Sequence, residues 1–435
     1  MGACRRSPPP GPRPAQKPTI DQAWAAAKLP HLSRTPIIPA RRTNVLPVPP
    51  RTGPPDDPRL VALGKKIFFD ARLSQPPGTS CASCHDPARA FSGAHGSHLG
   101  VPLGSRPGHF ARRSTPSVLY LRYTPAFYFF EDDENPAPEP RGGFFWDGRA
   151  DTIAALVRQP LFNPDEMNAG TPRRLAQKVA RAPYAAAFRE AFGPSAEPEA
   201  VMRGVGVALQ AFLESDEMTP ASSKYDAYVR GQATLTEAER RGLEVFKDRR
   251  RGACAGCHRM AETSSNPADS MFTDYGYDAV ALPRNRQLDA SRNPAAFDLG
   301  LCERKNPHTP SADPRFCSSF RTPSLRNAAV RQSFGHNGVY KSLREVLAFY
   351  AHRAVAPGRV YLPGQKFDDV PAKYRANVNV YSPVYNRREG AAPPLSDQDI
   401  DDLIAFLGTL TDGPFVAAAA GPAGAAVAES RVAPP

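Results

Sequence analysis

Two short stretches of this 435-residue chain carry the same pattern of reactive side chains. Each has two cysteines separated by two residues and followed at once by a histidine: Cys81, Cys84 and His85 in the first, and Cys254, Cys257 and His258 in the second. The spacing Cys-x-x-Cys-His is typical of covalent c-type haem attachment. The thiols bind the vinyl groups from one turn, and the histidine behind them bonds the iron. The sequence therefore predicts two covalently bound haem c groups, with His85 and His258 as iron ligands.

The alternative for these cysteines is a structural zinc site or free thiols, because paired Cys-x-x-Cys units also build four-cysteine zinc sites. Two observations favour haem. The two pairs lie far apart in the sequence, and each is followed by a histidine that a zinc site of this kind does not need.

Composition favours helices joined by long loops. The chain holds 49 prolines, which break regular sheets, and it is long enough for two or three domains. The formal net charge of +12 suits an acidic electron-donor protein or an anionic surface. We find no arginine-rich helix with interleaved aromatic residues, so nucleic acid is not an expected partner.

The remaining cysteines bear on the compartment. Cys302 and Cys317 flank a polar loop and are a candidate disulfide, with two free thiols as the alternative. Covalent haem attachment and a disulfide both indicate a periplasmic or otherwise exported protein, although no signal peptide is visible. Cys4 has two open interpretations, a lipid-modified cysteine that anchors the chain to a membrane or a plain surface cysteine. No apolar run is long enough to span a bilayer.

The chain divides into four expected regions. Residues 1–55 form a Pro-rich arm, 56–230 an N-terminal haem domain, 231–412 a C-terminal haem domain and 413–435 a disordered tail. A weak repeat supports two similar modules, because an apolar helix leads into each attachment motif. The second of these helices has its own start signal, a capping box made by Thr236 and Glu239.

Helical spacing of apolar residues predicts further helices. They cover residues 20–29, 58–69, 151–157, 172–187, 198–213, 342–351 and 397–410. Residues 131–143 form an acidic, Pro-rich insertion of unassigned purpose. The predicted fold class is mainly α, with two cytochrome c-like haem domains and long Pro-rich loops.

Several motifs together resemble the bacterial di-haem cytochrome c peroxidase and MauG family. They lie at residues 63–70, 81–87, 113–118, 145–150, 163–167 and 322–327. The resemblance spans roughly residues 56–412. It implies that the N-terminal haem reacts with hydrogen peroxide and that the C-terminal haem passes electrons to it. It also implies an electron-donor cytochrome or cupredoxin as partner.

The resemblance assigns two catalytic residues. Glu166 stands where the family keeps a catalytic carboxylate, and we expect it to move a proton during cleavage of the O–O bond. Trp146 matches a tryptophan between the haems that relays electrons or holds a radical. The alternatives are a solvated loop carboxylate for Glu166 and simple core packing for Trp146.

The second haem needs a ligand opposite His258. Family members that draw on external cytochromes use methionine there, but no methionine follows Met271. Tyr350 stands at the matching position, as in the MauG branch, and a phenolate stabilises high oxidation states of iron. We therefore expect Tyr350 to be a metal ligand, with a core aromatic as the alternative. His352 is the nearest rival, but it lies two residues along the helix and faces elsewhere.

The first haem site departs from the family in its loop. His95, His98 and His109 lie there, and none falls at the expected offset, so the site is either open or capped by His109. A glutamine common in that pocket is Leu156 in this chain.

An inter-haem calcium is a further feature of the family. Its usual asparagine is Ser114 in this chain, and its carbonyl-bearing segment is 331–333, where Arg331 offers a cation of its own. Calcium is therefore an open expectation.

Three functions follow from these assignments. The first is a peroxide-reacting di-haem oxidoreductase of the cytochrome c peroxidase type. The second is MauG-like oxidation of protein or aromatic substrates. The third is a non-enzymatic electron-transfer cytochrome, which needs no carboxylate like Glu166 beside an open iron.

Overall fold

A computed structural model describes residues 57–131, 138–288, 293, 295–305 and 313–419, together with the backbone of 37–39. Regular structure within these ranges is mainly helical. The α-helices are α2 (Pro58–Phe68), α3 (Cys81–Cys84), α4 (Ile153–Phe162), α5 (Pro172–Ala180), α6 (Ala185–Phe192), α7 (Pro198–Leu213), α8 (Lys224–Val229), α9 (Glu237–Lys247), α11 (Leu343–His352), α12 (Asp397–Gly408) and α13 (Val416–Ala419). Short 3₁₀ turns interrupt the loops between them.

Sheet structure is sparse and lies in the loops. The strands are β1 (Ile37–Pro39), β2 (Tyr128–Glu131), β3 (Glu139–Arg141), β4 (Tyr277–Asp278) and β5 (Phe320–Arg321). β2 pairs in parallel with β1 and antiparallel with β3, and β4 pairs antiparallel with β5. The two ends of the predicted insertion at 131–143 are thus held together by the β2–β3 pairing.

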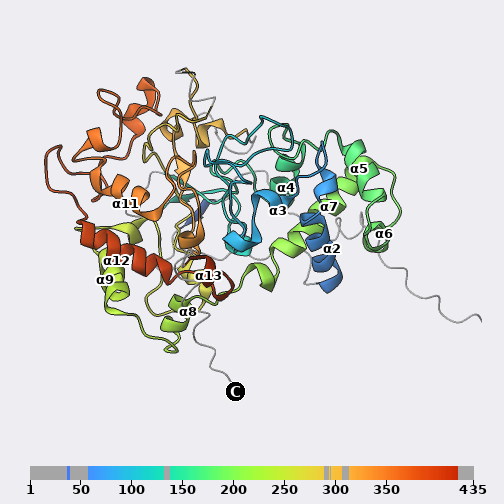
Figure 1. Cartoon of the computed structure of the whole chain (residues 1–435), viewed down its shortest axis with the longest axis horizontal. Helices are drawn as coiled ribbons and strands as arrows, with labels where there is room; N and C mark the ends of the chain where they lie inside the picture. Colours follow the sequence, from blue (N-terminus) through green and yellow to red (C-terminus); the bar gives the residue numbers. More distant parts are fainter. Residues whose placement is uncertain are drawn as a thin grey trace, which may run out of the picture.

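The helices gather at the two ends of an elongated molecule, with the long loops between them (Figure 1). α2 packs along α7 at one end, and α9 packs along α12 at the other. Each pair has its own hydrophobic core, the first containing Ile67 and Phe212 and the second Phe246 and Phe406.

A glycine lets each helix pair approach closely. A Cβ atom on Gly64 of α2 would lie 1.9 Å from the Ala208 carbonyl oxygen of α7. A Cβ atom on Gly242 of α9 would lie 1.9 Å from the Asp402 carbonyl oxygen of α12. Since a carbon atom cannot approach an oxygen this closely, only glycine permits these crossings. The repeat seen before the two attachment motifs is therefore a repeat of the same helix packing.

Most helix predictions are confirmed, including the Thr236–Glu239 capping box and Ser396 as the N-cap of α12. The predicted helix at 172–187 is wrong in one respect, because it is two helices, α5 and α6. Pro183 lies in the turn between them and has no N–H group with which to continue α5. The helix predicted to end at residue 157 continues to Phe162 as α4.

The tail prediction for 413–435 requires correction at its start. Gly413–Phe415 forms a 3₁₀ turn, α13 follows, and Phe415 packs in the first core. Asp412, just before it, is buried and accepts hydrogen bonds from the Tyr120 hydroxyl at 2.8 Å and the Asn327 amide at 2.7 Å. The helix predicted at 20–29, Cys4 and residues 420–435 lie outside the described residues, as does the Pro-rich arm apart from β1.

The predicted disulfide between Cys302 and Cys317 is present. Among the helices of the described ranges, none has both the length and the apolar character that crossing a bilayer requires. Buried ion pairs add rigidity to the loop region. Arg113 donates to Asp298 at 2.7 Å and to Asp147 at 2.5 Å, and Arg326 makes a bidentate pair with Asp226.

Candidate haem-binding sites

The first attachment turn is a single turn of helix, α3, with Ser80 as its N-cap. His85 follows directly, and its Nδ1 lies 3.1 Å from the carbonyl oxygen of Phe91, to which it donates. This hydrogen bond fixes the ring and leaves Nε2 for a metal, as is usual for ligating histidines. The neighbouring backbone is held by Ser117, whose hydroxyl donates to the Ala90 carbonyl at 2.6 Å.

The second attachment turn repeats this arrangement. Nδ1 of His258 lies 2.9 Å from the carbonyl oxygen of Phe272, and the Ser324 hydroxyl donates to the Met271 carbonyl at 2.6 Å. Burial lowers the pKa of His85 to about 4 and also lowers the pKa of His258. Both imidazoles are therefore neutral at pH 7, which is the form that binds a metal.

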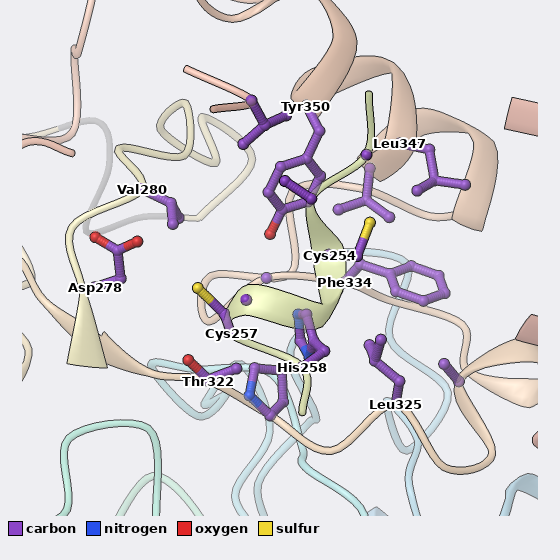
Figure 2. A pocket seen from close by; sticks show the side chains of 18 of the residues that line it. Cys254, Cys257, His258, Asp278, Val280, Thr322, Leu325, Phe334, Leu347 and Tyr350 are labelled. Carbon is purple, nitrogen blue, oxygen red and sulfur yellow. The ribbon is translucent and has the colours of Figure 1, made fainter. Parts of the chain in front are cut away.

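A cavity of about 390 Å³ lies beside the second turn, and its walls are mostly apolar. Cys254, Cys257 and His258 line it, and Tyr350 enters from α11 with its hydroxyl directed into the space (Figure 2). His352 does not line the cavity, and its Nε2 lies 3.3 Å from a guanidinium nitrogen of Arg359. Of the two candidates on this helix, Tyr350 is the one that faces the attachment turn.

Three polar residues of this cavity were not assigned by sequence reasoning. Tyr385 stacks on Tyr350 with ring centroids 5.9 Å apart. Asp278 accepts from the Asn379 amide at 2.7 Å, and burial raises its pKa to about 6. His336 stacks on Phe320 with centroids 3.5 Å apart. The sequence offers a signal for His336 alone, because it lies in a glycine-containing turn, Phe334–Gly338.

Glu166 lies next to the first attachment turn. Burial raises the pKa of the Cys84 thiol to about 12, and the nearby Glu166 carboxylate adds to the rise. The Asn163 amide donates to Glu166 Oε1 at 3.0 Å, and burial nevertheless raises the pKa of Glu166 above its ordinary value of 4.5. Gly104 packs against the backbone of Asp165, so the loop 163–167 is held against the loop that follows the first motif.

Two of the three histidines in the loop after the first attachment turn form hydrogen bonds with protein groups, and the third is exposed. Nδ1 of His109 lies 2.8 Å from the Asp165 carboxylate, and its side chain is 40% exposed. Nδ1 of His95 lies 2.8 Å from the Leu103 carbonyl, and His98 is exposed. Leu156, which replaces the family's glutamine, packs against the first core.

Trp146 joins the segment of Ser114 to the wall of the second cavity. Its indole N–H donates to the Ser114 carbonyl at 2.9 Å, and its ring lines the second cavity. Its own carbonyl accepts from the Arg321 N–H at 2.7 Å. Asp147, the next residue, is buried and ion-paired with Arg113 and Arg149. These contacts hold the indole in one orientation.

The residues fit haem c at both turns. All four thiols are free and partly accessible, and each histidine keeps Nε2 for iron. Within the described ranges, no three His, Cys, Asp or Glu side chains converge as a metal site, so the cysteine pairs do not form the alternative zinc site.

The expected inter-haem calcium fits poorly. The Ser114 hydroxyl donates to the Gly335 carbonyl at 2.6 Å, and the Arg331 guanidinium binds the nearby carbonyl oxygens of Thr115 and Ser333.

Two attachment turns, each with a histidine bonded to a backbone carbonyl and a serine that holds the neighbouring backbone, define a c-type di-haem protein. Comparison with known proteins identifies its family. Residues 58–234 match the family described as di-haem cytochrome c peroxidase. The methylamine utilization protein MauG of Paracoccus denitrificans is 32% identical over 82% of this chain and 90% of its own length. The cytochrome c551 peroxidase of Pseudomonas aeruginosa is 28% identical over 68% of this chain and 72% of its own length.

A solved structure is similar throughout. The diheme peroxidase BthA of Burkholderia thailandensis is 49% identical, covers 88% of this chain and 92% of its own, and superposes with a TM-score of 0.80. The chain therefore belongs to the di-haem cytochrome c peroxidase and MauG family. It is an oxidoreductase whose cofactors are two haem c groups.

Proposed function

We propose that the protein reacts with hydrogen peroxide at the N-terminal haem and supplies electrons to that site through the C-terminal haem. Haem c provides an iron that binds peroxide at one site and accepts and passes electrons at the other. The observation that carries the proposal is the difference between the surroundings of the two attachment turns. A half-buried carboxyl, Glu166, lies near the first turn, whereas a phenol, Tyr350, faces the second.

Glu166 is suited to moving the peroxide proton. Burial raises its pKa, so the Glu166 carboxylate is a stronger base than a solvated carboxylate and accepts a proton more readily. The Asn163 amide orients it, and Arg149 nearby favours its ionised form. His109 is held at the surface by Asp165, which supports an open first iron over one capped by His109.

Tyr350 and His258 are the proposed ligands of the second iron. Burial raises the pKa of the Tyr350 phenol, so ionisation at neutral pH requires a positive centre such as ferric iron. Trp146, which lines the second cavity and donates to the Ser114 carbonyl, is the proposed electron relay.

MauG-like oxidation of a protein or aromatic substrate is the second candidate function. Tyr350 favours it, because a phenolate stabilises oxidised iron where a thioether stabilises reduced iron. A plain electron carrier is less well supported, since it has no use for Glu166.

The proposed partners and location rest on charge and chemistry. The net charge of +12 suits an electron-donor cytochrome or cupredoxin with an acidic surface. Thioether attachment and the Cys302–Cys317 disulfide both suit a periplasmic or otherwise exported protein.

Replacing Tyr350 with Phe tests the ligand assignment. We expect the second haem to change from low-spin to high-spin, because phenylalanine offers no donor atom; optical and EPR spectra of the ferric protein measure this. Tyr361→Phe is the matched control, since Tyr361 is a buried tyrosine outside the cavity whose hydroxyl donates to the Ala281 carbonyl at 2.5 Å. An unchanged spectrum of Tyr350→Phe would show that the phenol is no ligand.

A further inference from the structure

Arg331 lies where the two halves of the molecule meet. It follows the 3₁₀ turn Ala328–Val330 and lines the second cavity. Its Nε donates to the Ser333 carbonyl at 3.3 Å, and one terminal nitrogen donates to the Thr115 carbonyl at 3.2 Å. Thr115 belongs to the segment beside the first attachment site, so the guanidinium joins backbone from both halves.

The charge of Arg331 has no carboxylate partner among the described residues. Burial lowers its pKa to about 10. Arg113 and Arg326 differ, because each is buried against an aspartate that raises its pKa. Arg331 is nevertheless charged at neutral pH, so a half-buried positive charge stands here with no counter-ion among the described residues.

The guanidinium contacts the surroundings of both haem sites. It donates to the Thr115 carbonyl, and Thr115 pairs with Gly93 in the loop that follows the first attachment turn. It also lines the cavity that His258 and Trp146 share. A positive charge between two metal sites acts on both, and partial removal from water strengthens the effect.

A calcium ion cannot use the same oxygen atoms. Calcium takes six to eight oxygen ligands, usually including carboxylates. The carbonyl oxygens of Thr115 and Ser333 already accept from the guanidinium, and the Ser114 hydroxyl donates to Gly335. The described residues bring no cluster of three acidic or histidine side chains to the position.

We propose that the Arg331 guanidinium is a built-in cation between the two haem sites, occupying the carbonyl-lined position that an inter-haem calcium ion would require. The inference depends on the two haem c groups, and it is independent of the roles proposed for Glu166 and Tyr350.

Metal analysis gives the first test. The haem-loaded protein is dialysed against calcium-free buffer, its calcium content is measured by mass spectrometry, and thermal unfolding and haem potentials are recorded with and without EGTA. We expect substoichiometric calcium and no response to EGTA. One tightly held calcium ion per chain, or potentials that move on chelation, would overturn the proposal.

Charge variants give the second test. Arg331→Gln is expected to shift both haem midpoint potentials to lower values, because a nearby positive charge favours the reduced iron. Arg331→Lys keeps the charge, so both haem midpoint potentials are expected to stay close to those of the native protein. Arg181→Gln, which removes an exposed arginine at the end of α5, is the control for loss of an arginine elsewhere. Unshifted midpoint potentials in Arg331→Gln, or equal shifts in Arg331→Gln and Arg331→Lys, would contradict the proposal that Arg331 acts through its charge. If the Gln variant does not fold, the Lys variant and the EGTA titration decide.

Discussion

Glu166 is the residue on which the chemistry of the first site depends. Its carboxyl is close enough to Cys84 to influence that thiol, and its orientation is set by Asn163. The neighbouring Asp165 is more exposed and pairs with His109. Two adjacent carboxyls thus have different environments, and only the less exposed one, Glu166, is suited to proton transfer.

Glu166→Gln is expected to reduce the rate of reaction with peroxide by roughly 10²–10⁴-fold, the usual contribution of a positioned proton-transfer group. Accepting the peroxide proton requires the carboxylate form, which is lost as pH falls through the raised pKa. The native enzyme should therefore show an acidic limb in its pH–rate profile centred above pH 4.5, and the variant should lack it. Stopped-flow measurements across pH check both points.

Glu190→Gln serves as the control. It removes a strongly exposed carboxylate on α6 and should leave the rate and the acidic limb nearly unchanged. A normal peroxide rate in Glu166→Gln would refute its assignment.

Residues whose chemistry requires a fixed local spacing could be predicted from the sequence. The two attachment motifs are of this kind, because one turn of chain supplies both thiols and the histidine. Asp278, His336 and Tyr385 could not be predicted, since each reaches the second cavity from a different loop. No local pattern records which distant loops meet, so their positions became visible only in the fold.

Helices and their starts could also be predicted, because caps and apolar spacing are local. The Thr236 and Ser396 capping boxes both form. Errors arose where a single residue outweighed the periodic pattern, as at Pro183, or where burial ordered a sequence of small residues. The segment after Asp412 is ordered because Phe415 packs in the core and Asp412 bonds to Tyr120.

Gly242→Ala tests the helix crossing that supports the second attachment turn. The added Cβ would lie 1.9 Å from a backbone oxygen of α12, which cannot move aside as a flexible side chain can. Overpacking of this kind costs about 1–3 kcal/mol, which should exceed the gain of up to about 1 kcal/mol from the helix propensity of alanine. Denaturant unfolding of the haem-loaded protein is expected to show lower stability.

The control is Gly408→Ala at the end of α12, where an added Cβ meets no atom within 4 Å. Its stability should equal or slightly exceed that of the native protein. Equal stability of the two variants would mean that the α9–α12 crossing is not as close as described.

At the scale of the whole molecule, the same parts occur twice with different surroundings. Each half has a glycine-mediated helix crossing, an attachment turn, a histidine held by a carbonyl and a Thr-Pro-Ser segment behind it. The halves differ in the groups that face the expected haem, with Glu166 in one and Tyr350 in the other. The duplication and the cation offered by Arg331 could be predicted from the sequence, whereas the contacts of Arg331 with backbone from both halves required the fold.

Inequivalence of the two haems is the central claim, and EPR of the resting ferric protein tests it most directly. Spin quantification on protein whose mass shows two attached haems should give one high-spin haem, open on one side, and one low-spin haem with ligands on both sides. Two low-spin haems in the resting protein, with no change on addition of peroxide, would contradict the account.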